Sequence, residues 1–240
     1  MKNVCDLCNS ENFDIIYSGK IRDGSYGKYT NTDRNIIKCA NCGLIRLEKN
    51  ELPEDFYQSS NYRNSYNDTD KSEDYIQAHD IEQIPKLQHL NLEDFRDKVV
   101  LDNGCGGGAF LDLIHGVSSK SIGIEPFTSY HESLTKRNHE IFSDAKSALE
   151  TYKGKIDTII STGVIEHVDS PTMYLEDSLN LLSDKGSIYL ETDNFDDILR
   201  KLNIKNFESF FYRTAHLTYF SSDTLVKLFE KVGFSQVQVL

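Results

Sequence analysis

The chain has 240 residues, of which 38% are hydrophobic and 11% aromatic. This length allows one large domain or one domain with a small module, and the composition excludes disorder along the whole chain. Acidic residues outnumber basic residues by 38 to 26, which gives a formal net charge of −12 and disfavours nucleic acids and anionic membranes as partners.

The N-terminus, MKNVCDLCNS, lacks the apolar core of a signal peptide. Every apolar run in the sequence is far shorter than the roughly 20 residues that a membrane span requires. We therefore expect a cytoplasmic protein that acts on a small molecule and does not insert into a membrane.

Two C-x-x-C pairs lie near the N-terminus and consist of Cys5, Cys8, Cys39 and Cys42. Four thiolates on two such knuckles suit a tetrahedral Zn²⁺ ion, and a closed shell of four leaves no position for water. The odd total of five cysteines argues against a disulfide framework. We expect a structural zinc ribbon over residues 1–50, with free thiols or an iron–sulfur cluster as the alternatives. The segments FDIIYSG and NIIKC predict a hairpin between the two pairs.

Residues 51–97 are expected to form a linker and N-terminal helices. The stretch up to residue 70 is polar and rich in Tyr, Asn and Ser, which is typical of a connecting segment. Helical spacing of apolar residues begins near Ser72 and continues to about Asn91, and Pro85 is expected to kink or divide that helix.

From residue 98 to 240, short apolar strands alternate with helical segments. The expected strands are VVLDNG, SIGIEP, EIFSD, KIDTIISTGVIEHV with its loop, SIYLETD and a final SQVQVL. A helix is expected from Pro171 to just before Gly186, and another ends at Gly233. The alternation predicts an α/β fold with a doubly wound, Rossmann-like parallel sheet.

A glycine run follows the first of these strands. Asp102 ends the strand, and Gly104, Gly106 and Gly108 stand at alternate positions after it. Glycine allows a ligand to approach the backbone closely, and ligands bind at the carboxyl ends of such strands. Glu125 ends the next strand, where a carboxylate accepts hydrogen bonds from ribose hydroxyls. A bare glycine triplet also fits a dinucleotide site or a simple tight turn.

The sequence VLDNGCGGG resembles the first motif of the class I S-adenosylmethionine-dependent methyltransferases. The resemblance implies that Asp102 and the backbone of Gly104–Gly108, with Cys105, face the methionine part of the cofactor and the adjacent ribose. It also implies that Glu125 binds the ribose diol and that Asp144 lies near the adenine amino group. Asp144 is equally suited to cap the helix that follows it.

The segment STGVIEHVDSP resembles the fourth motif of the same family. Gly163 would then line the methyl-transfer pocket, and His167 is a candidate general base, or a residue that only shapes the loop. The later YRTAHLTYFSS resembles an EHLxYFS stretch in a bacterial group that modifies sugars and surface polysaccharides. His216 is the leading base candidate, with a buried structural histidine as the alternative. Ala215 replaces the glutamate of that pattern.

Together these features predict a methyltransferase with an N-terminal zinc ribbon that uses S-adenosylmethionine on a small polar acceptor. A sugar or sugar nucleotide in surface-polysaccharide or secondary-metabolite biosynthesis is the expected acceptor. Tyr57, Tyr62 and Tyr66 are expected to cap the pocket or to pack the ribbon. Because the methyltransferases that these motifs resemble usually have a seventh strand, we expect this chain to be one strand short. The alternatives are an RNA or protein methyltransferase and a non-catalytic, cofactor-binding scaffold.

Overall fold

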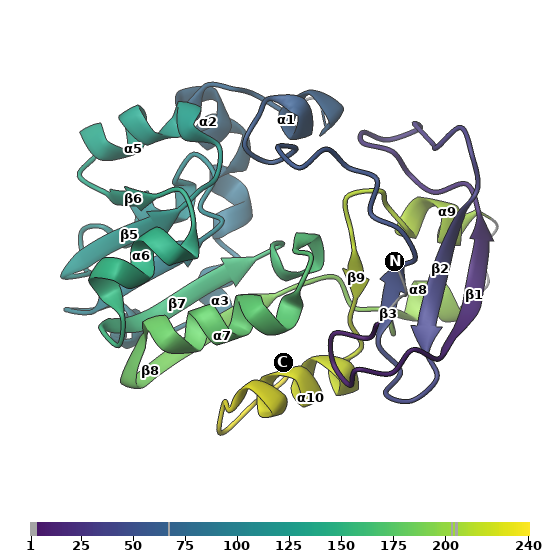
Figure 1. Cartoon of the computed structure of the whole chain (residues 1–240). Helices are drawn as coiled ribbons and strands as arrows, with labels where there is room; N and C mark the ends of the chain where they lie inside the picture. Colours follow the sequence, from purple (N-terminus) through teal and green to yellow (C-terminus); the bar gives the residue numbers. More distant parts are fainter. Residues whose placement is uncertain (1–3, 67, 203, 205) are drawn as a thin grey trace. The chain divides into compact units, whose positions relative to one another are not determined.

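The computed structural model describes residues 4–66, 68–202, 204 and 206–240 (Figure 1). The chain divides into two compact units, each built from separate segments of the sequence. The ribbon unit comprises Met1–Glu54, Gly163–Glu176 and Thr192–Leu240, and the α/β unit comprises Asp55–Thr162 and Asp177–Glu191. The domain boundaries expected at residues 50 and 97 stay predictions.

The α/β unit contains a five-stranded, wholly parallel sheet in the order β6-β5-β4-β7-β8. The strands are β4 (Val99–Asn103), β5 (Lys120–Ile124), β6 (Glu140–Phe142), β7 (Ile156–Thr162) and β8 (Leu182–Glu191). The chain builds outward from β4 to β6 on one side and then to β8 on the other. This reversal between β4 and β7 is where such sheets bind ligands. The predicted Rossmann-like fold class is confirmed.

Short helices connect and flank these strands (Figure 1). They are α1 (Asn61–Tyr66), α2 (Ser72–Gln83), α3 (Lys86–His89), η1 (Leu92–Asp94), α4 (Ala109–Ile114), η2 (Thr128–Tyr130), α5 (His131–Lys136) and α6 (Ala145–Tyr152). Pro85 separates α2 from α3, as expected from a residue that cannot continue a helical hydrogen-bond ladder. Helix α1 lies inside the stretch that was expected to be a simple connection.

The core of the α/β unit packs apolar side chains of β4 and α4 against the segment after β5. Val100, Phe110 and Leu111 are almost fully buried, as are Phe127 and Tyr130. Burying each such side chain stabilises the fold by roughly 1.5–3 kcal/mol. This packing fixes the two chain segments that flank the glycine turn.

The ribbon unit contains a four-stranded antiparallel sheet in the order β1-β2-β3-β9. Its strands are β1 (Phe13–Gly19), β2 (Arg34–Cys39), β3 (Ile45–Leu47) and β9 (Thr218–Tyr219). The hairpin predicted between the cysteine pairs is confirmed as β1 and β2. The unexpected strand is β9, which brings a segment far along the sequence onto the edge of the N-terminal sheet.

The remaining helical elements follow β7 and β8 in the chain. They are η3 (Ile165–His167), α7 (Pro171–Leu181), α8 (Ile198–Lys201), α9 (Phe207–Phe211) and α10 (Ser222–Val232). Ser221 caps α10 through the amide of Thr224, and Gly233 ends it at φ 111°. The end at Gly233 is the one predicted from the sequence.

Two expected boundaries are wrong. Helix α7 ends at Leu181 and Gly186 lies inside β8, because the segment from Leu182 onward pairs with β7 instead of continuing the helix. Residues 235–240 form no strand, although SQVQVL was expected to be one. Their side chains are partly or fully exposed, so no neighbouring element provides the hydrogen bonds that a strand requires.

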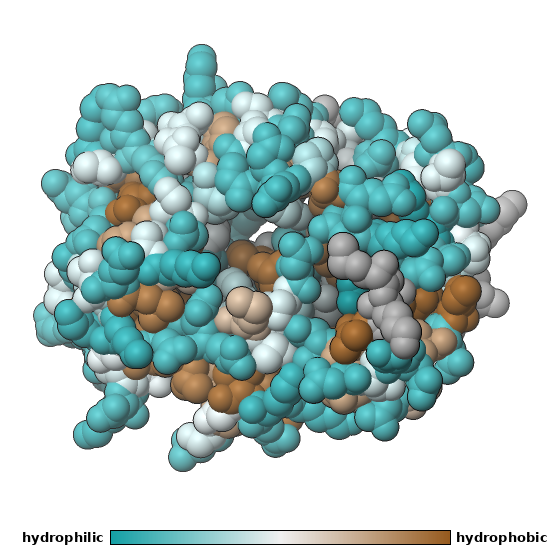
Figure 2. Space-filling view, in the orientation of Figure 1, coloured by the Kyte–Doolittle hydropathy of each residue, from teal (hydrophilic) through white to brown (hydrophobic). Residues whose placement is uncertain are grey.

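Hydrophilic residues predominate on the molecular face drawn in Figure 2. Large apolar side chains are exposed at scattered positions such as Ile81, Leu92 and Met173. Across the described residues, the helices are too short or too polar to traverse a lipid bilayer.

Candidate functional site

The turn after β4 carries the candidate cofactor-binding residues of the α/β unit. Gly104, Gly106 and Gly108 have φ angles of 87°, 54° and 88°, which side-chain-bearing residues rarely adopt. Gly108 is the residue that directly precedes α4. The glycine spacing noted in the sequence is therefore required by the backbone path of this turn.

Two further sequence-predicted residues lie at the same turn. Asp102 is 4% exposed, and burial raises the pKa of its carboxyl to about 6, while the nearby charge of Lys86 opposes that shift. Cys105 is buried, and its sulfur lies so close to Gly123 that a Cβ there would approach it to 2.6 Å. Cys105 therefore fills the space beside β5 and its thiol is inaccessible to solvent.

Glu125, at the end of β5, lies beside the glycine turn, as expected. Its two carboxylate oxygens accept hydrogen bonds at 2.9 Å from the amides of Gly106 and Phe127. Burial raises the pKa of Glu125, and the charge of Arg63 opposes this shift. The carboxylate is thus held against the turn, and its binding of a ribose diol stays a prediction.

Residues from α1 and α2 cover this turn, which the sequence did not indicate. A Cβ on Gly106 or Gly107 would lie 2.5 or 2.6 Å from the Tyr75 side chain. The guanidinium of Arg63 lies between the rings of Tyr75 and Tyr130, within 5.4 Å of each centroid. The sequence analysis predicted the helix that carries Tyr75 from its apolar spacing, but it did not predict that this helix lies over the glycine turn.

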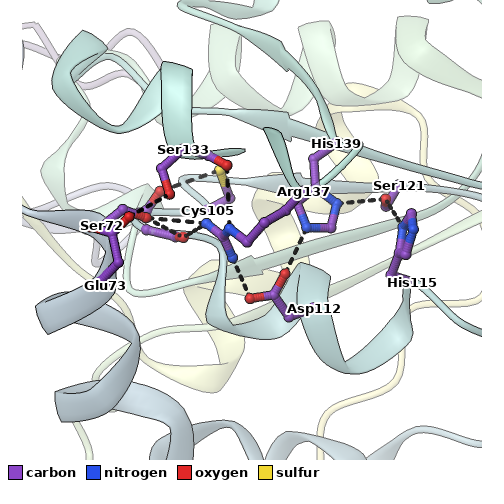
Figure 3. A network of polar contacts seen from close by, with 11 residues as sticks. Ser72, Glu73, Cys105, Asp112, His115, Ser121, Ser133, Arg137 and His139 are labelled. Carbon is purple, nitrogen blue, oxygen red and sulfur yellow. Dashed lines mark hydrogen bonds and ion pairs between the residues drawn. The ribbon is translucent and has the colours of Figure 1, made fainter. Parts of the chain in front are cut away.

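A polar network behind the turn connects α2, α4 and α5 (Figure 3). Arg137 donates hydrogen bonds to Ser72, to the Gly107 carbonyl and to Asp112. The other Asp112 oxygen lies 2.8 Å from Nε2 of His139. Ser121 lies 2.7 Å from Nδ1 of that histidine. Although this is the residue set of a hydrolytic triad, Ser121 is 2% exposed and inaccessible to substrate, so the network positions the turn.

Asp144, expected near the adenine, caps α6. Its carboxylate accepts a hydrogen bond from the amide of Ser147 at 2.9 Å. The structure therefore shows the capping arrangement that the sequence left open, and a role toward the cofactor stays a prediction.

The tyrosines of the linker form an aromatic cluster. The ring centroids of Tyr57 and Tyr62 are 5.2 Å apart, and those of Tyr62 and Tyr66 are 4.9 Å apart. Tyr62 also lies against the guanidinium of Arg63. Tyr62 therefore connects this cluster to the aromatic rings that surround Arg63. A capping role for the three tyrosines stays a prediction.

A second group of candidate residues, described by itself, lies in the ribbon unit, where η3 follows β7 in the chain. Gly163 has a φ of 66°, and a Cβ there would lie 3.8 Å from the carboxylate of Glu166. Glu166 is 4% exposed, and its Oε2 accepts a hydrogen bond from the Thr192 hydroxyl at 2.8 Å. Burial raises the pKa of Glu166, and the charge of neighbouring His167 opposes this shift.

The two histidines predicted as candidate bases lie together. The ring centroids of His167 and His216 are 4.7 Å apart, and the rings are nearly perpendicular at 89°. His167 Nδ1 lies 2.8 Å from the carbonyl of Ala215, so this nitrogen carries the proton and donates it.

His216 is buried among charged groups. Its Nε2 lies 3.3 Å from Arg213 Nη1, and its Nδ1 lies 3.5 Å from the carboxylate of Asp193. Burial, followed by the charges of His167 and Arg213, holds the pKa of His216 well below its usual range. The imidazole is therefore neutral at neutral pH, and its lone pair lies on Nε2, where it accepts a hydrogen bond from the Arg213 guanidinium.

The four cysteines of the N-terminal pairs form one tight group. Sγ of Cys5 lies 3.4 Å from that of Cys42, and Sγ of Cys8 lies 3.5 Å from that of Cys39. All four sulfurs lie within 4.8 Å of one another and are unbridged by disulfides. Four thiols at these separations fit a tetrahedral metal with bonds of about 2.3 Å.

Aspartate 6, inside the first C-x-x-C pair, joins this cysteine group to the start of α7. Asp6 accepts hydrogen bonds from the Ser170 hydroxyl at 2.7 Å and from the Thr172 amide at 2.8 Å. The segment that carries Glu166 and His167 is therefore tied at its far end to a cysteine knuckle.

The geometry of the turn agrees with comparisons to known proteins. The sequence model of the methyltransferase domain family matches residues 76–239, more than half of the chain. The chain therefore belongs to this family. Its parallel sheet and glycine turn are those of an S-adenosylmethionine-dependent methyltransferase domain.

Individual relatives are distant. The chain is similar to a tRNA U34 carboxymethyltransferase of Campylobacter fetus, with 30% identity over 110 residues, 43% of this chain and 38% of that protein. It is also similar to the mitochondrial ubiquinone biosynthesis O-methyltransferase of Rattus norvegicus, with 26% identity over 40% of this chain and 28% of the relative. The chain thus spans less than half the length of these two curated relatives.

Solved structures share the fold. A SAM-dependent methyltransferase from Archaeoglobus fulgidus matches with a TM-score of 0.52 and 19% identity, over 74% of each chain. A SAM-dependent methyltransferase from Thermotoga maritima, described as a possible histamine N-methyltransferase, matches with a TM-score of 0.51 and 22% identity, over 67% of this chain and 73% of that one.

Proposed function

We propose that the protein is a cytoplasmic S-adenosylmethionine-dependent methyltransferase that acts on a small polar acceptor. The observation that carries the proposal is the Glu125 carboxylate, held by the amide of Gly106 at the switch point of a methyltransferase-family sheet. S-adenosylmethionine supplies an electrophilic methyl group when bound at such a turn. Asp102, Cys105 and the Gly104–Gly108 backbone are the proposed contacts for its amino-acid part.

The acceptor must lose a proton when it is a hydroxyl. Its oxygen then attacks the methyl carbon, the carbon–sulfur bond breaks, and the electron pair of that bond stays on sulfur. His167 and His216 are the groups that we propose to take this proton. Burial keeps the imidazole of His216 neutral, which is the state that a general base requires.

We propose a sugar or sugar nucleotide as the acceptor, in surface-polysaccharide or secondary-metabolite biosynthesis. The support is the sequence around His216, which resembles sugar-modifying methyltransferases, together with the net charge of −12. We also propose that the cysteine group holds one structural zinc ion and that the ribbon, linker and methyltransferase regions are divided near residues 50 and 97.

A second candidate, tRNA modification, is favoured by one observation, the 30% identity to a tRNA U34 carboxymethyltransferase. The acidic charge of this chain disfavours it, because binding to a polyanion depends on neutralising its phosphates.

The two acceptor classes are separated by a transfer assay with methyl-labelled S-adenosylmethionine. We expect label in sugar nucleotides and none in bulk tRNA. Label in tRNA alone would overturn the small-molecule proposal. Cofactor binding without transfer to any acceptor class would favour the scaffold alternative.

A further inference from the structure

The ring of Tyr75 lies on the glycine turn that is proposed to hold the cofactor. In a ligand-binding turn, glycine has no Cβ, and this leaves room for the ligand to approach the backbone. At Gly106 and Gly107 that room is taken by Tyr75, whose nearest atoms would lie 2.5 and 2.6 Å from an added Cβ. The protein therefore fills part of this surface with one of its own side chains.

The guanidinium of Arg63 occupies a second part of the same surface, the Glu125 carboxylate. Glu125 is 4% exposed, and its two oxygens accept hydrogen bonds from the amides of Gly106 and Phe127. Nη2 of Arg63 lies 3.7 Å from Oε1 of this carboxylate. A carboxylate offers about four lone-pair positions, and the two amides use two of them. A ribose diol needs the other two, so it competes with Arg63 for Oε1.

Arg63 and Tyr75 also hold each other in place. The guanidinium carbon of Arg63 lies 5.1 to 5.8 Å from the ring centroids of Tyr62, Tyr75, Phe127 and Tyr130. Contacts between a cation and aromatic rings contribute most where water is excluded, and Arg63 is 8% exposed. The ring on the glycines and the cation on the carboxylate therefore belong to one packed group. We call Arg63 and Tyr75, together with helix α1, the gate.

The two helices that carry these residues are held differently. The start of α2 is fixed to the turn, because the Ser72 hydroxyl donates a hydrogen bond to the Gly107 carbonyl at 3.0 Å and Arg137 donates one to Ser72. Helix α1 has six residues, too few to be stable alone, so its position depends on contacts such as those of Arg63. Displacing Arg63 therefore frees α1 to move relative to the fixed start of α2.

We propose that the cofactor must displace this gate: Arg63 leaves Glu125 with α1, and the Tyr75 ring leaves Gly106 and Gly107, when S-adenosylmethionine or its demethylated product binds. The observed dissociation constant is then the intrinsic one divided by the fraction of molecules in which the gate is open. The gate rests on the proposed function, because it requires the cofactor to bind at Glu125. It adds a conformational step that controls cofactor entry.

The first test is calorimetry with the full-length protein and two ligands. S-adenosylhomocysteine carries both the ribose diol and the amino-acid part, whereas 5′-methylthioadenosine carries the diol alone. Arg63→Met removes the competitor for Glu125, so both ligands should bind about 5-fold more tightly. Lys136→Met is the control, because it removes the cation of a solvent-exposed pair with Glu132 and should bind like the wild type.

Tyr75→Ala tests the other half of the gate. It uncovers the glycine turn and leaves the Arg63–Glu125 pair in place. S-adenosylhomocysteine should bind about 3-fold more tightly to this variant, because more molecules are open. Circular dichroism verifies that each variant is folded, and Tyr75→Ala tests the gate even where Arg63→Met fails to fold.

Hydrogen exchange tests the gate in the wild type. The amides of Asn64 and Asp68 donate hydrogen bonds at 2.8 Å to the carbonyls of Ser60 and Arg63. Saturating S-adenosylhomocysteine should accelerate exchange at both amides by about 3-fold or more, because α1 is displaced, and should leave exchange in β4 unaccelerated. A ligand ordinarily slows exchange in the segments that it stabilises, so acceleration distinguishes a displaced gate from a helix that closes over the cofactor.

Three results would overturn the gate. The first is weaker or unchanged binding of S-adenosylhomocysteine by folded Arg63→Met, which would make Arg63 a cofactor ligand or a bystander. The second is the same result for folded Tyr75→Ala. The third is slower or unchanged exchange at Asn64 and Asp68 in the saturated wild type. Each of these, in a protein that binds the ligand, overturns the gate alone. Absence of binding by the wild type and by every folded variant overturns the proposed methyltransferase function itself.

Discussion

The guanidinium of Arg63 lies 3.7 Å from the carboxylate of Glu125 inside the α/β unit. Arg63 comes from α1, whereas Glu125 ends β5, so this ion pair joins the linker helices to the central sheet. Arg63 also donates a hydrogen bond to Asp68 at 3.0 Å. The carboxylate at the cofactor turn thus has a buried cation as its neighbour.

Removing this cation should destabilise the α/β unit. Arg63→Met leaves Glu125 buried without a counter-charge, and breaking a buried ion pair from one side costs about 3 kcal/mol. Urea denaturation followed by circular dichroism measures this loss. Lys136→Met removes a cation from a solvent-exposed pair with Glu132 and is the control that should keep the wild-type midpoint. Equal midpoints for both variants would contradict the assigned role of Arg63.

The contact between Tyr75 and the glycine turn predicts a specific steric effect. Gly106→Ala places a Cβ 2.5 Å from the Tyr75 hydroxyl at a positive φ, and should cost roughly 1–3 kcal/mol. Gly116→Ala is the matched control, because an added Cβ there meets nothing within 4 Å.

Combining Gly106→Ala with Tyr75→Ala relieves the clash but not the backbone strain. The double-mutant cycle should therefore give an interaction energy of at least about 0.5 kcal/mol. Strict additivity of the two losses would show that Tyr75 does not lie over the turn.

Asp102 predicts how stability depends on pH. Its folded-state pKa of about 6 lies above the ordinary value of 3.8 for an aspartate, so the folded state binds more protons between these values. Stability should therefore fall as pH rises from about 4 to 6 because of this group, by about 3 kcal/mol in total. Asp102→Asn removes the effect and should be more stable than the wild type at pH 8. The difference should vanish below pH 4. Denaturation curves are measured for the wild type and Asp102→Asn at pH 8 and below pH 4. The same difference in stability at both pH values would contradict this prediction.

The cysteine group predicts one zinc ion per chain. Elemental analysis should give about one equivalent for the wild type and for Cys105→Ala, and almost none for folded Cys39→Ser. Because Asp6 joins the first knuckle to α7, zinc loss should also increase amide hydrogen exchange at Thr172. Zinc retained by Cys39→Ser at the wild-type level would exclude this cysteine as a ligand.

The sequence predicted those parts of the site that depend on local spacing. The cysteine pairs, the glycine turn after β4 and Glu125 at the end of β5 each lie within a short motif, and a short motif fixes its own backbone path. The positive φ angles at Gly104 and Gly108 are an example.

The parts that the sequence did not predict depend on contacts between distant segments. Arg63 meets Glu125 across 62 residues of sequence, and β9 pairs with β3 through Tyr219 and Ile45. The wrong end of α7 has a different cause. Residues from Leu182 onward can form a helix or a strand by composition, and pairing with β7 decides between them.

Calorimetric titration with S-adenosylhomocysteine tests the central claim most directly. We expect one binding site per wild-type chain, and a loss of affinity of at least about 10-fold in Glu125→Gln, because the charged acceptor for the ribose hydroxyls is removed. Glu132→Gln, at an exposed glutamate, is the control and should bind like the wild type. A folded wild-type protein that binds no S-adenosylhomocysteine, or a Glu125→Gln variant that binds it equally well, would contradict the account.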